Sequence, residues 1–329
     1  MPIAPGFEAK WQNVPDYVLG ITHEIWERRR ISSLEQYYAS DLIVRSPASI
    51  VVGNRGIVAA TQATLAEFPD RELPGEDVIW CWSDSSRSAF LSSHRLLCRA
   101  THSGPGLYGA PTGRKLTYRI LADCYCAQNQ VRDEWLIRDQ GAIVRQMGSS
   151  PEAWVRALIQ REGGPDACVP PFTPERDVAG PYNGRGTDNE IGASLVAYVS
   201  AGLSGAAGAL QNLVDRAAEL HYPGMQTAHG RAASAAFWLA LRSALPDARP
   251  AIHHVVGRDD PSMPPRAAVR WSLTGLHDGA VLFGPASGVR IHVMGITHAE
   301  FGPRGLRREW TLFDETAIWK QILLATGRV

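Results

Sequence analysis

The sequence predicts an α+β fold that is present twice in one chain, and three observations lead to this prediction. Residues 95–146 align with residues 270–321 without a gap, and residues 53–70 align with residues 230–247, so the chain contains an internal repeat. Within each copy, helix-like sequence precedes strand-like sequence, an order that is typical of α+β domains. The repeat is as long as a small domain and much longer than the units of solenoid proteins.

The helices come first in each copy. In chain order, the predicted elements are a helix at 15–39 and 188–220, an extended segment ending in proline at 42–47 and 220–223, and a second helix at 53–68 and 230–245. Each second helix stops at a Pro-Asp pair, because the residue before a proline disfavours the α conformation. A further short helix is expected at 151–162.

Four strand-like runs follow the second helix. In the second copy they lie at 251–256, 267–277, 289–299 and 306–313, with turn residues between them. A curved antiparallel sheet wrapped on a helix would form a cone with an internal pocket. We therefore expect two cone-shaped domains, at 7–160 and 186–329, joined by a linker at 161–185. We expect the two domains to pack as an intramolecular pseudo-dimer, and a further homodimer stays open.

The composition argues against several classes of protein. Lys and Arg together number 33, as do Asp and Glu, so the chain lacks the basic excess of a nucleic-acid-binding protein. No apolar run is long enough for a membrane span, and the first residues lack the pattern of a signal peptide. The cysteines number five and do not suggest a disulfide framework, which favours a location in the cytoplasm.

The repeated pattern E-W-x-x-x-D-x-x-A-I-x-x-Q combines residue types that suit acid/base chemistry. It places Asp139 after Trp135 in the first copy and Asp314 after Trp310 in the second. Because side chains along a strand alternate in direction, each aspartate shares a strand face with its tryptophan. A carboxyl group on an apolar face can have a raised pKa and take a proton from carbon next to a carbonyl. Alternatively, each aspartate caps the helix that follows it.

This pattern resembles the C-terminal signature of the SnoaL-like polyketide cyclases, as do the glycine-rich segments at 100–113 and 274–288. The resemblance covers most of both halves. It implies two tandem cystatin-like cones of the nuclear transport factor two-like class, although members of the family are usually single domains. It also implies acid/base chemistry on a small molecule, an intramolecular aldol closure, without a metal or other cofactor.

Carried over by position, the acid/base aspartate of the family falls on Asp139 and Asp314. The histidine that assists it, from the neighbouring strand, falls on His298 in the second copy but on Asp123 in the first. Because only the second copy keeps both groups, we expect it to carry the activity, with Asp314 as base and His298 as proton donor or orienting group. The alternative is that both pockets are active on different ligands.

The expected function is that of a cofactor-independent acid/base enzyme, an ester cyclase, aldol-type lyase or isomerase, acting on a small apolar enolisable carbonyl compound. The alternatives are a non-catalytic ligand-binding or interaction module and a cone-fold hydrolase with an aspartate-activated water. The expected catalytic residues are Asp314, His298 and Asp139. The expected substrate-binding residues are Trp310, His221, Tyr222, Trp135, Asp123, Trp80 and Trp82.

Several of these residues also have a structural interpretation. His298 suits either a pocket or a purely structural role. His102 and His277 are repeated before glycine turns, where they either bond the turn or line the pocket. Trp80 and Trp82 share a strand face and either pack in the core or line a ring-binding cavity.

Overall fold

The computed structural model describes residues 3–329 and contains two successive α+β domains. The first comprises α1 (Val14–Trp26), α2 (Ser33–Tyr37), β1 (Tyr38–Ser46), β2 (Ser49–Val52), α3 (Asn54–Glu67), β3 (Gly75–Trp82), β4 (Ala89–Thr101), β5 (Lys115–Ala127), β6 (Gln130–Arg138), α4 (Gln140–Gln146) and α5 (Pro151–Arg161). The second comprises α6 (Glu190–Ser204), α7 (Ala207–Leu213), β7 (Val214–Tyr222), β8 (Gln226–His229), α8 (Gly230–Ala244), β9 (Arg249–Arg258), β10 (Arg266–Leu276), β11 (Arg290–Gly302), β12 (Gly305–Phe313) and α9 (Glu315–Thr326). Within the described range, no helix is both long and apolar enough to cross a membrane.

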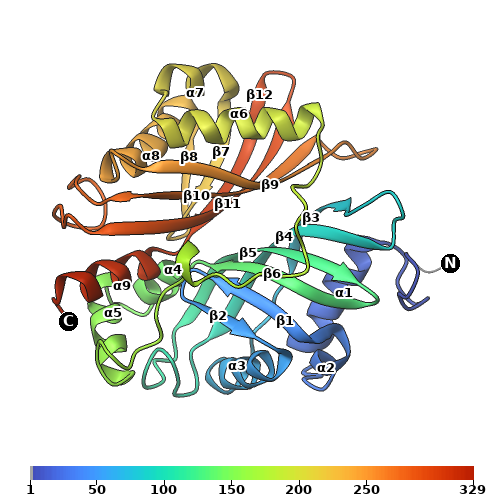
Figure 1. The fold of residues 1–329 in the computed structure, drawn as a ribbon, viewed down its shortest axis with the longest axis horizontal. Helices are drawn as coiled ribbons and strands as arrows, with labels where there is room; N and C mark the ends of the chain where they lie inside the picture. The colour runs from blue at the N-terminus through green and yellow to red at the C-terminus, as the bar shows by residue number, and fades with distance from the viewer. Residues whose placement is uncertain (1–2) are drawn as a thin grey trace.

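The two domains lie one on the other, with their sheets facing each other. The sheets have the strand orders β2-β1-β6-β5-β4-β3 and β8-β7-β12-β11-β10-β9. In Figure 1, α1, α2 and α3 cover the lower sheet from below, and α6, α7 and α8 cover the upper sheet from above. The expectation of two tandem α+β cone domains is confirmed.

Each sheet is mixed, which corrects the expectation of an antiparallel sheet. Strands β3 to β6 form an antiparallel meander, but β1 pairs in parallel with β6, and β7 pairs in parallel with β12. The parallel pair arises because β2 and α3 carry the chain from β1 to the far edge of the sheet, from which the meander returns. The short strands β2 and β8, which pair with β1 and β7, were not predicted.

The long first helix predicted in each copy is divided into two helices. Between α1 and α2, Arg29 has a φ angle of 57°, and Gly205 ends α6 with a φ angle of 78°. A residue in the left-handed region cannot continue a right-handed helix. The predicted helices were also too long, because residues 38–39 belong to β1 and residues 214–220 belong to β7.

The repeated histidines make turn hydrogen bonds, one of the two roles expected for them. His102 contacts Thr112 through Nδ1 at 3.1 Å and the buried Glu67 carboxylate through Nε2 at 3.2 Å. His277 contacts Ser287 through Nδ1 at 3.0 Å. Each histidine therefore fixes the loop between two strands at the same place in its domain.

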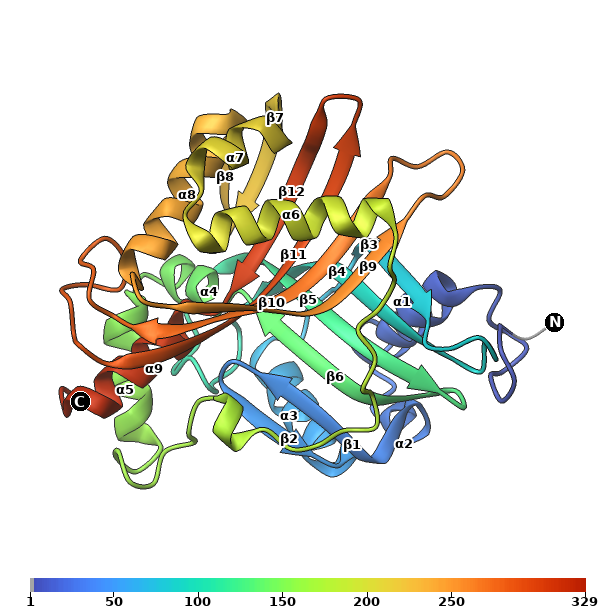
Figure 2. The same ribbon diagram turned by 45° about the horizontal axis from the view of Figure 1, so that its top comes forward.

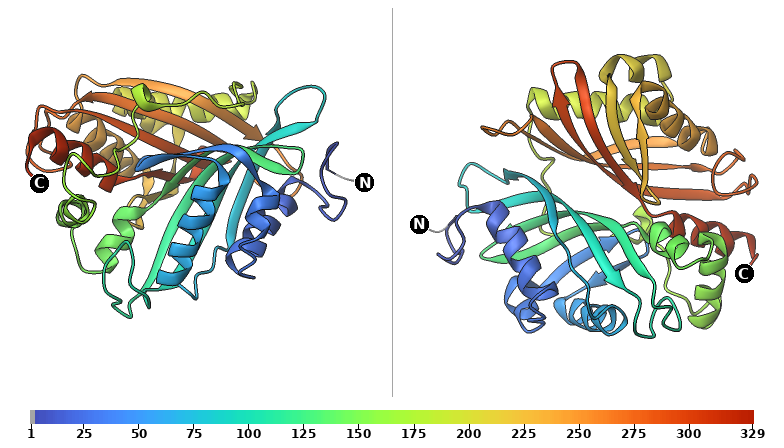
Figure 3. Two further views of the ribbon diagram at one scale, coloured as in Figure 1. Left: turned by 60° about the horizontal axis from the view of Figure 1, so that its bottom comes forward. Right: turned by 180° about the vertical axis from the view of Figure 1, so that it is seen from behind.

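The face of each sheet that points away from its helices is called the outer face. The outer faces of the two sheets pack together and form a common apolar core. Its buried members are Leu121, Trp135, Ile137, Phe172, Met294, Ile296 and Leu312. Figures 2 and 3 show the sheets packed against each other, with the helices α1–α3 and α6–α8 on their far sides. Because residues of both domains are buried in one core, the expected intramolecular pseudo-dimer is confirmed.

The segment between the domains is part of this packing. Phe172 from this segment inserts into the interdomain core. Farther along, the N–H of Thr187 donates to Val255 of β9 at 2.8 Å, and the N–H of Val255 donates to Arg185 at 3.0 Å. Backbone pairing of this kind protects part of an edge strand from other partners.

A repeated glycine provides a test of the shared fold. A Cβ atom at Gly104 would lie 2.0 Å from the carbonyl oxygen of Ala66, so we expect Gly104→Ala to lower the free energy of unfolding by about 1–3 kcal/mol. The control is Gly208→Ala in α7, where nothing lies within 4 Å, and it should raise the free energy of unfolding by up to about 1 kcal/mol. Urea denaturation measures both, and equal stability of the two variants would contradict the packing described.

Candidate functional site

The two faces of each sheet have different surroundings. Along β6, Trp135 and Ile137 point into the interdomain core, whereas Glu134 and Leu136 point toward the helices of the first domain. Trp135 and Trp310 were expected to bind substrate. Both lie instead at the interdomain interface, where they are 8% and 7% exposed.

Each repeated tryptophan is contacted by the repeated arginine of the other domain. The guanidinium of Arg270 lies 3.8 Å from the centre of the Trp135 ring, and that of Arg95 lies 3.5 Å from the Trp310 ring. The two contacts are equivalent under the pseudo-twofold relation of the domains. Cation–π contacts are strongest where water is excluded. These repeated residues therefore serve domain pairing.

A residue of the same domain also stacks on each tryptophan. The rings of His221 and Trp310 are nearly parallel, with centroids 5.4 Å apart, and Arg45 lies 4.8 Å from the Trp135 ring. Arg45 is buried and forms an ion pair with Asp133. His221, which was expected at the mouth of a pocket, thus lies at the domain junction.

The polar residues between the sheets differ on the two sides of the pseudo-twofold relation. Arg270 donates to Asp123 at 3.1 Å, whereas Arg95 donates to Nδ1 of His298 at 3.3 Å. Ser93 bridges the two sides, 2.5 Å from Asp123 and 2.8 Å from Nε2 of His298. Asp123 and His298 were expected in separate pockets, but both belong to this one interdomain network.

The positions of the hydrogens in this network follow from which groups can only donate and which can only accept. Burial, and secondarily Arg95, hold the pKa of His298 well below its usual range, so the imidazole is neutral. A guanidinium only donates, so Nδ1 of His298 accepts and Nε2 carries the hydrogen. Ser93 then accepts from His298 and donates to Asp123. A serine activated by a histidine base needs the opposite direction, so this network is structural.

The repeated aspartates cap helices, which was the alternative to a catalytic role. Asp139 accepts hydrogen bonds from the N–H groups of Ala142 at 3.0 Å and of Gly224, in the β7–β8 turn, at 2.9 Å. Asp314 accepts from the N–H of Thr316 at 2.8 Å and from its hydroxyl at 2.7 Å. Asp139 therefore caps α4 and also connects the first domain to the β7–β8 turn of the second domain.

The predicted acid/base pair of Asp314 and His298 is not formed. His298 lies opposite Trp310, and Asp314 lies farther along, just beyond the end of β12. A strand rises roughly 3.3 Å per residue, so about 13 Å separates the two positions. One substrate atom cannot contact both groups.

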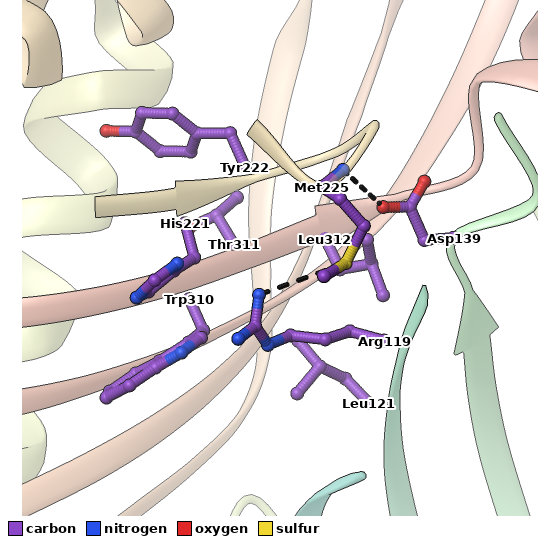
Figure 4. Close-up of a pocket in the computed structure, with 9 residues that line it drawn as sticks. All are labelled: Arg119, Leu121, Asp139, His221, Tyr222, Met225, Trp310, Thr311 and Leu312. Atoms are coloured by element: carbon purple, nitrogen blue, oxygen red, sulfur yellow. Dashed lines mark hydrogen bonds between the residues drawn. The ribbon is translucent and has the colours of Figure 1, made fainter. Parts of the chain in front are cut away.

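Four predicted site residues do meet in a small pocket at the domain junction (Figure 4). Asp139, His221, Tyr222 and Trp310 line it together with Arg119. Its volume is ≈ 10 Å³, which is room for about one water molecule. The pocket does not accommodate an organic substrate.

A polar cluster that was not predicted lies on the inner face of the first sheet, which is the face covered by α1, α2 and α3 (Figure 1). The strand register places Ser92 opposite Cys124, and Cys124 opposite Glu134, so that these side chains form a row across β4, β5 and β6. His94 is the next inward-facing residue on β4. Tyr38 is close enough that, after burial, the charge of Glu134 contributes to raising the pKa of its phenol.

The polar atoms of this cluster lack partners. Ser92 Oγ, His94 Nδ1 and the Tyr17 hydroxyl are buried without a hydrogen-bond partner among residues 3–329. Burial, and then the charge of Asp133, raise the pKa of Glu134 to about 7, and no hydrogen bond from a described residue offsets this. Burial lowers the pKa of His94 to about 4. Buried polar groups without partners are rare in proteins and are typical of functional sites.

The equivalent glutamate of the second domain is fully bonded. Glu309 accepts from the hydroxyls of Tyr198 at 2.6 Å, Tyr222 at 3.0 Å and Thr311 at 2.7 Å. Burial raises its pKa to about 7 as well, although these hydrogen bonds oppose the effect. Tyr222, which was expected to bind substrate, is therefore part of a closed polar network.

Apolar side chains fill the second cone. Ala267 and Val269 take the places of Ser92 and His94. On α8, Trp238 is fully buried, and its indole N–H bonds Tyr198 in the same network. In the repeat, Thr61 on α3 corresponds to Trp238, and α3 buries fewer residues than α8. The inner polar side chains of the second cone are therefore hydrogen-bonded to one another, whereas several of those in the first cone lack partners among residues 3–329.

Trp80 and Trp82 lie on the inner face beside the polar cluster. Their rings are 5.1 Å apart, and both lie 6.4 Å from Phe90. Trp80 is opposite Ser92 in the strand register. These rings form an apolar surface next to the polar cluster. Trp135, in contrast, lies on the outer face of the same sheet.

The cysteines offer no nucleophile. All five are free and buried, and burial raises the pKa of Cys124 and Cys126 well above the usual range. Thiols in such surroundings react poorly and are poor metal ligands. Across residues 3–329, no group of three or more His, Cys, Asp or Glu side chains is placed to hold a metal ion.

Comparison with known proteins identifies related sequences and structures. A family model described as SnoaL-like polyketide cyclase matches residues 17–147 and again residues 196–322, which is more than half of the chain. The solved structure of wild-type IdmH from Streptomyces antibioticus, named as a proposed polyketide cyclase, is 22% identical over 41% of this chain and 97% of its own, with a TM-score of 0.36. A protein from Jannaschia sp. CCS1, named as a proposed SnoaL-like polyketide cyclase, is 19% identical over 41% of this chain and 96% of its own, also with a TM-score of 0.36. No curated protein matches the chain.

The interdomain network predicts unequal effects for the two repeated arginines. Arg270→Met leaves Asp123 buried without its cation, so we expect the free energy of unfolding to fall by about 3–5 kcal/mol. Arg95→Met should cost only about 1–2 kcal/mol, because His298 is neutral and Glu76 keeps its second partner, Arg119. Urea denaturation at neutral pH compares them, and equal losses would contradict the assigned asymmetry.

The raised pKa of Glu134 predicts a pH-dependent stability. Its pKa in the folded chain is about 7, above the ordinary 4.5, so the folded state holds the proton more tightly. This contribution to stability is present at low pH and is lost as the pH rises from 4.5 to about 7. Glu134→Gln should therefore gain stability relative to the parent protein across that window and show no further gain above it. Thermal unfolding from pH 4.5 to 8 measures this, with Glu35→Gln, an exposed carboxylate, as a control that should show no trend.

Proposed function

Because the chain belongs to the SnoaL-like polyketide cyclases, we propose that it is a cofactor-independent acid/base enzyme whose chemistry takes place on the inner face of the first domain. Family membership supports a cyclase- or isomerase-type enzyme. The single observation that carries the more specific proposal is Glu134. It is a buried carboxyl group with a pKa of about 7 and no hydrogen-bond donor among residues 3–329, next to polar atoms of Ser92 and His94 that lack partners in the same range.

Glu134 is proposed as the general base. A base works best when its pKa lies close to the working pH, and burial brings Glu134 into that range. Its carboxylate takes a proton from the carbon next to a carbonyl, which leaves an enolate. The enolate then either takes the proton back at another carbon, which is an isomerisation, or attacks a second carbonyl carbon, which closes a ring. In the second case the carbonyl oxygen becomes an alkoxide, and it takes the proton back from Glu134.

The neighbouring residues suit the other requirements of this reaction. The hydroxyls of Tyr38 and Ser92 are candidates to donate a hydrogen bond to the enolate oxygen as its negative charge develops. Trp80 and Trp82 provide an apolar surface for the body of a small carbonyl compound. None of these steps uses a metal or other cofactor.

The second domain is proposed as a non-catalytic partner. Trp238 is buried beside Glu309, and three hydroxyl groups hold the Glu309 carboxylate, so this glutamate is not free to act on a ligand. A non-catalytic role for the whole chain is the second candidate function, and the filled second cone is the observation that favours it.

Proton exchange tests the proposed reaction without knowledge of the product. The full chain is incubated in heavy water with a panel of enolisable esters and diketones, and deuterium uptake next to the carbonyl is followed by NMR. We expect Glu134→Gln to reduce the exchange rate about 10²–10⁴-fold, and the rate of the parent protein to rise with pH and level off above about 7.

The matched controls are Glu309→Gln and Asp314→Asn. Both remove a buried carboxyl group of the second domain, and both should keep most of the exchange activity. Loss of exchange in Asp314→Asn with retention in Glu134→Gln would refute the assignment to the first domain. Absence of exchange with every compound of the panel would favour the non-catalytic alternative.

A further inference from the structure

A second cavity, of about 200 Å³, lies between α5 and α9, away from the inner-face cluster. Its walls come from both domains: Trp154 and Leu158 belong to α5, and Ala317 and Lys320 belong to α9. Figures 1 and 3 show these two helices side by side, near the C-terminus. A dry engineered cavity of roughly 150 Å³ binds benzene, so this volume is large enough for a small ring compound.

The wall of this cavity carries hydrogen-bond donors that are not used within the protein. Lys320 is 5% exposed and donates to Glu162 at 2.6 Å, with no other hydrogen bond to a described residue. An ammonium group has three donors, so two are left. The cavity therefore has a surplus of donors and calls for a ligand with an acceptor.

The charge of the cavity determines which acceptor fits. Glu162 already neutralises Lys320. A carboxylate ligand would bring a second negative charge next to Glu162, and burying an uncompensated charge costs far more than burying a carbonyl group. A ligand without any acceptor would leave the donors unpaired. A neutral carbonyl group satisfies both conditions.

We propose that this junction cavity binds a small, neutral, apolar molecule with one carbonyl acceptor, such as an aromatic ketone or ester. The carbonyl oxygen accepts a hydrogen bond from Lys320, and the apolar body packs against Val155 and Leu158. This site does not depend on Glu134 or on the proposed reaction. Because both domains supply its walls, a bound molecule stabilises their junction.

The test uses the full chain and three probes of nearly equal size: acetophenone, benzoate and ethylbenzene. Isothermal titration calorimetry should show that acetophenone binds about tenfold more tightly than either of the others, which is the expected effect of one hydrogen bond to a charged donor. Ala48→Trp, at an exposed turn on the cavity rim, should abolish this binding by filling the mouth. Lys320→Met should weaken it about tenfold.

A matched control variant completes the experiment. Val52→Trp adds the same side chain at an exposed position of β2 that does not line this cavity, and it should leave acetophenone binding unchanged. Binding that survives Ala48→Trp, tighter binding of benzoate, or equal binding of ethylbenzene would each overturn the proposal. If Lys320→Met does not fold, as judged by circular dichroism, the comparison of Ala48→Trp with Val52→Trp decides.

Discussion

The pairing of the two sheets depends on two reciprocal arginine–tryptophan contacts. Arg270 lies on Trp135 and Arg95 lies on Trp310, so each domain supplies one cation and one ring. A cation taken out of water between two sheets is costly unless a counter-charge or a π face accompanies it. Because the two contacts point in opposite directions across the interface, together they define how one domain is oriented on the other.

Use of the outer faces for pairing leaves only the inner faces for chemistry, and there the two domains have diverged. Glu134 and Glu309 are the same repeated residue, and burial raises the pKa of both to about 7. Three hydroxyl groups bind Glu309, and Trp238 fills the space around it, whereas Glu134 lies among polar atoms that have no partners in the described part of the chain. The surroundings, more than the identity of the residue, separate a structural carboxyl group from a reactive one.

The sequence predicted the order of helices and strands well, because caps, proline stops and strand alternation are local signals. It could not say which face of β6 is the inner one. Alternation tells which side chains share a face, but both faces are buried here, so hydrophobicity did not distinguish Trp135 from Glu134. The available signal was a charged residue, repeated in both copies, inside an apolar strand. The parallel β1–β6 pairing joins strands that are far apart in the sequence, so no local sequence pattern indicates it.

Fusion of the two domains in one chain has a consequence for how each half would behave alone. Two copies of the first half, joined as the domains are here, would place Arg95 against Asp123 at both ends of the interface, with opposite charges matched. Two copies of the second half would instead place Arg270 against the neutral His298 twice, with no carboxylate at either end. The charges would therefore be balanced in the first pairing and unbalanced in the second. A substitution in a symmetric homodimer always occurs at two places, and the covalent tandem removes that restriction, which is what allows an acid and an imidazole to occupy equivalent positions.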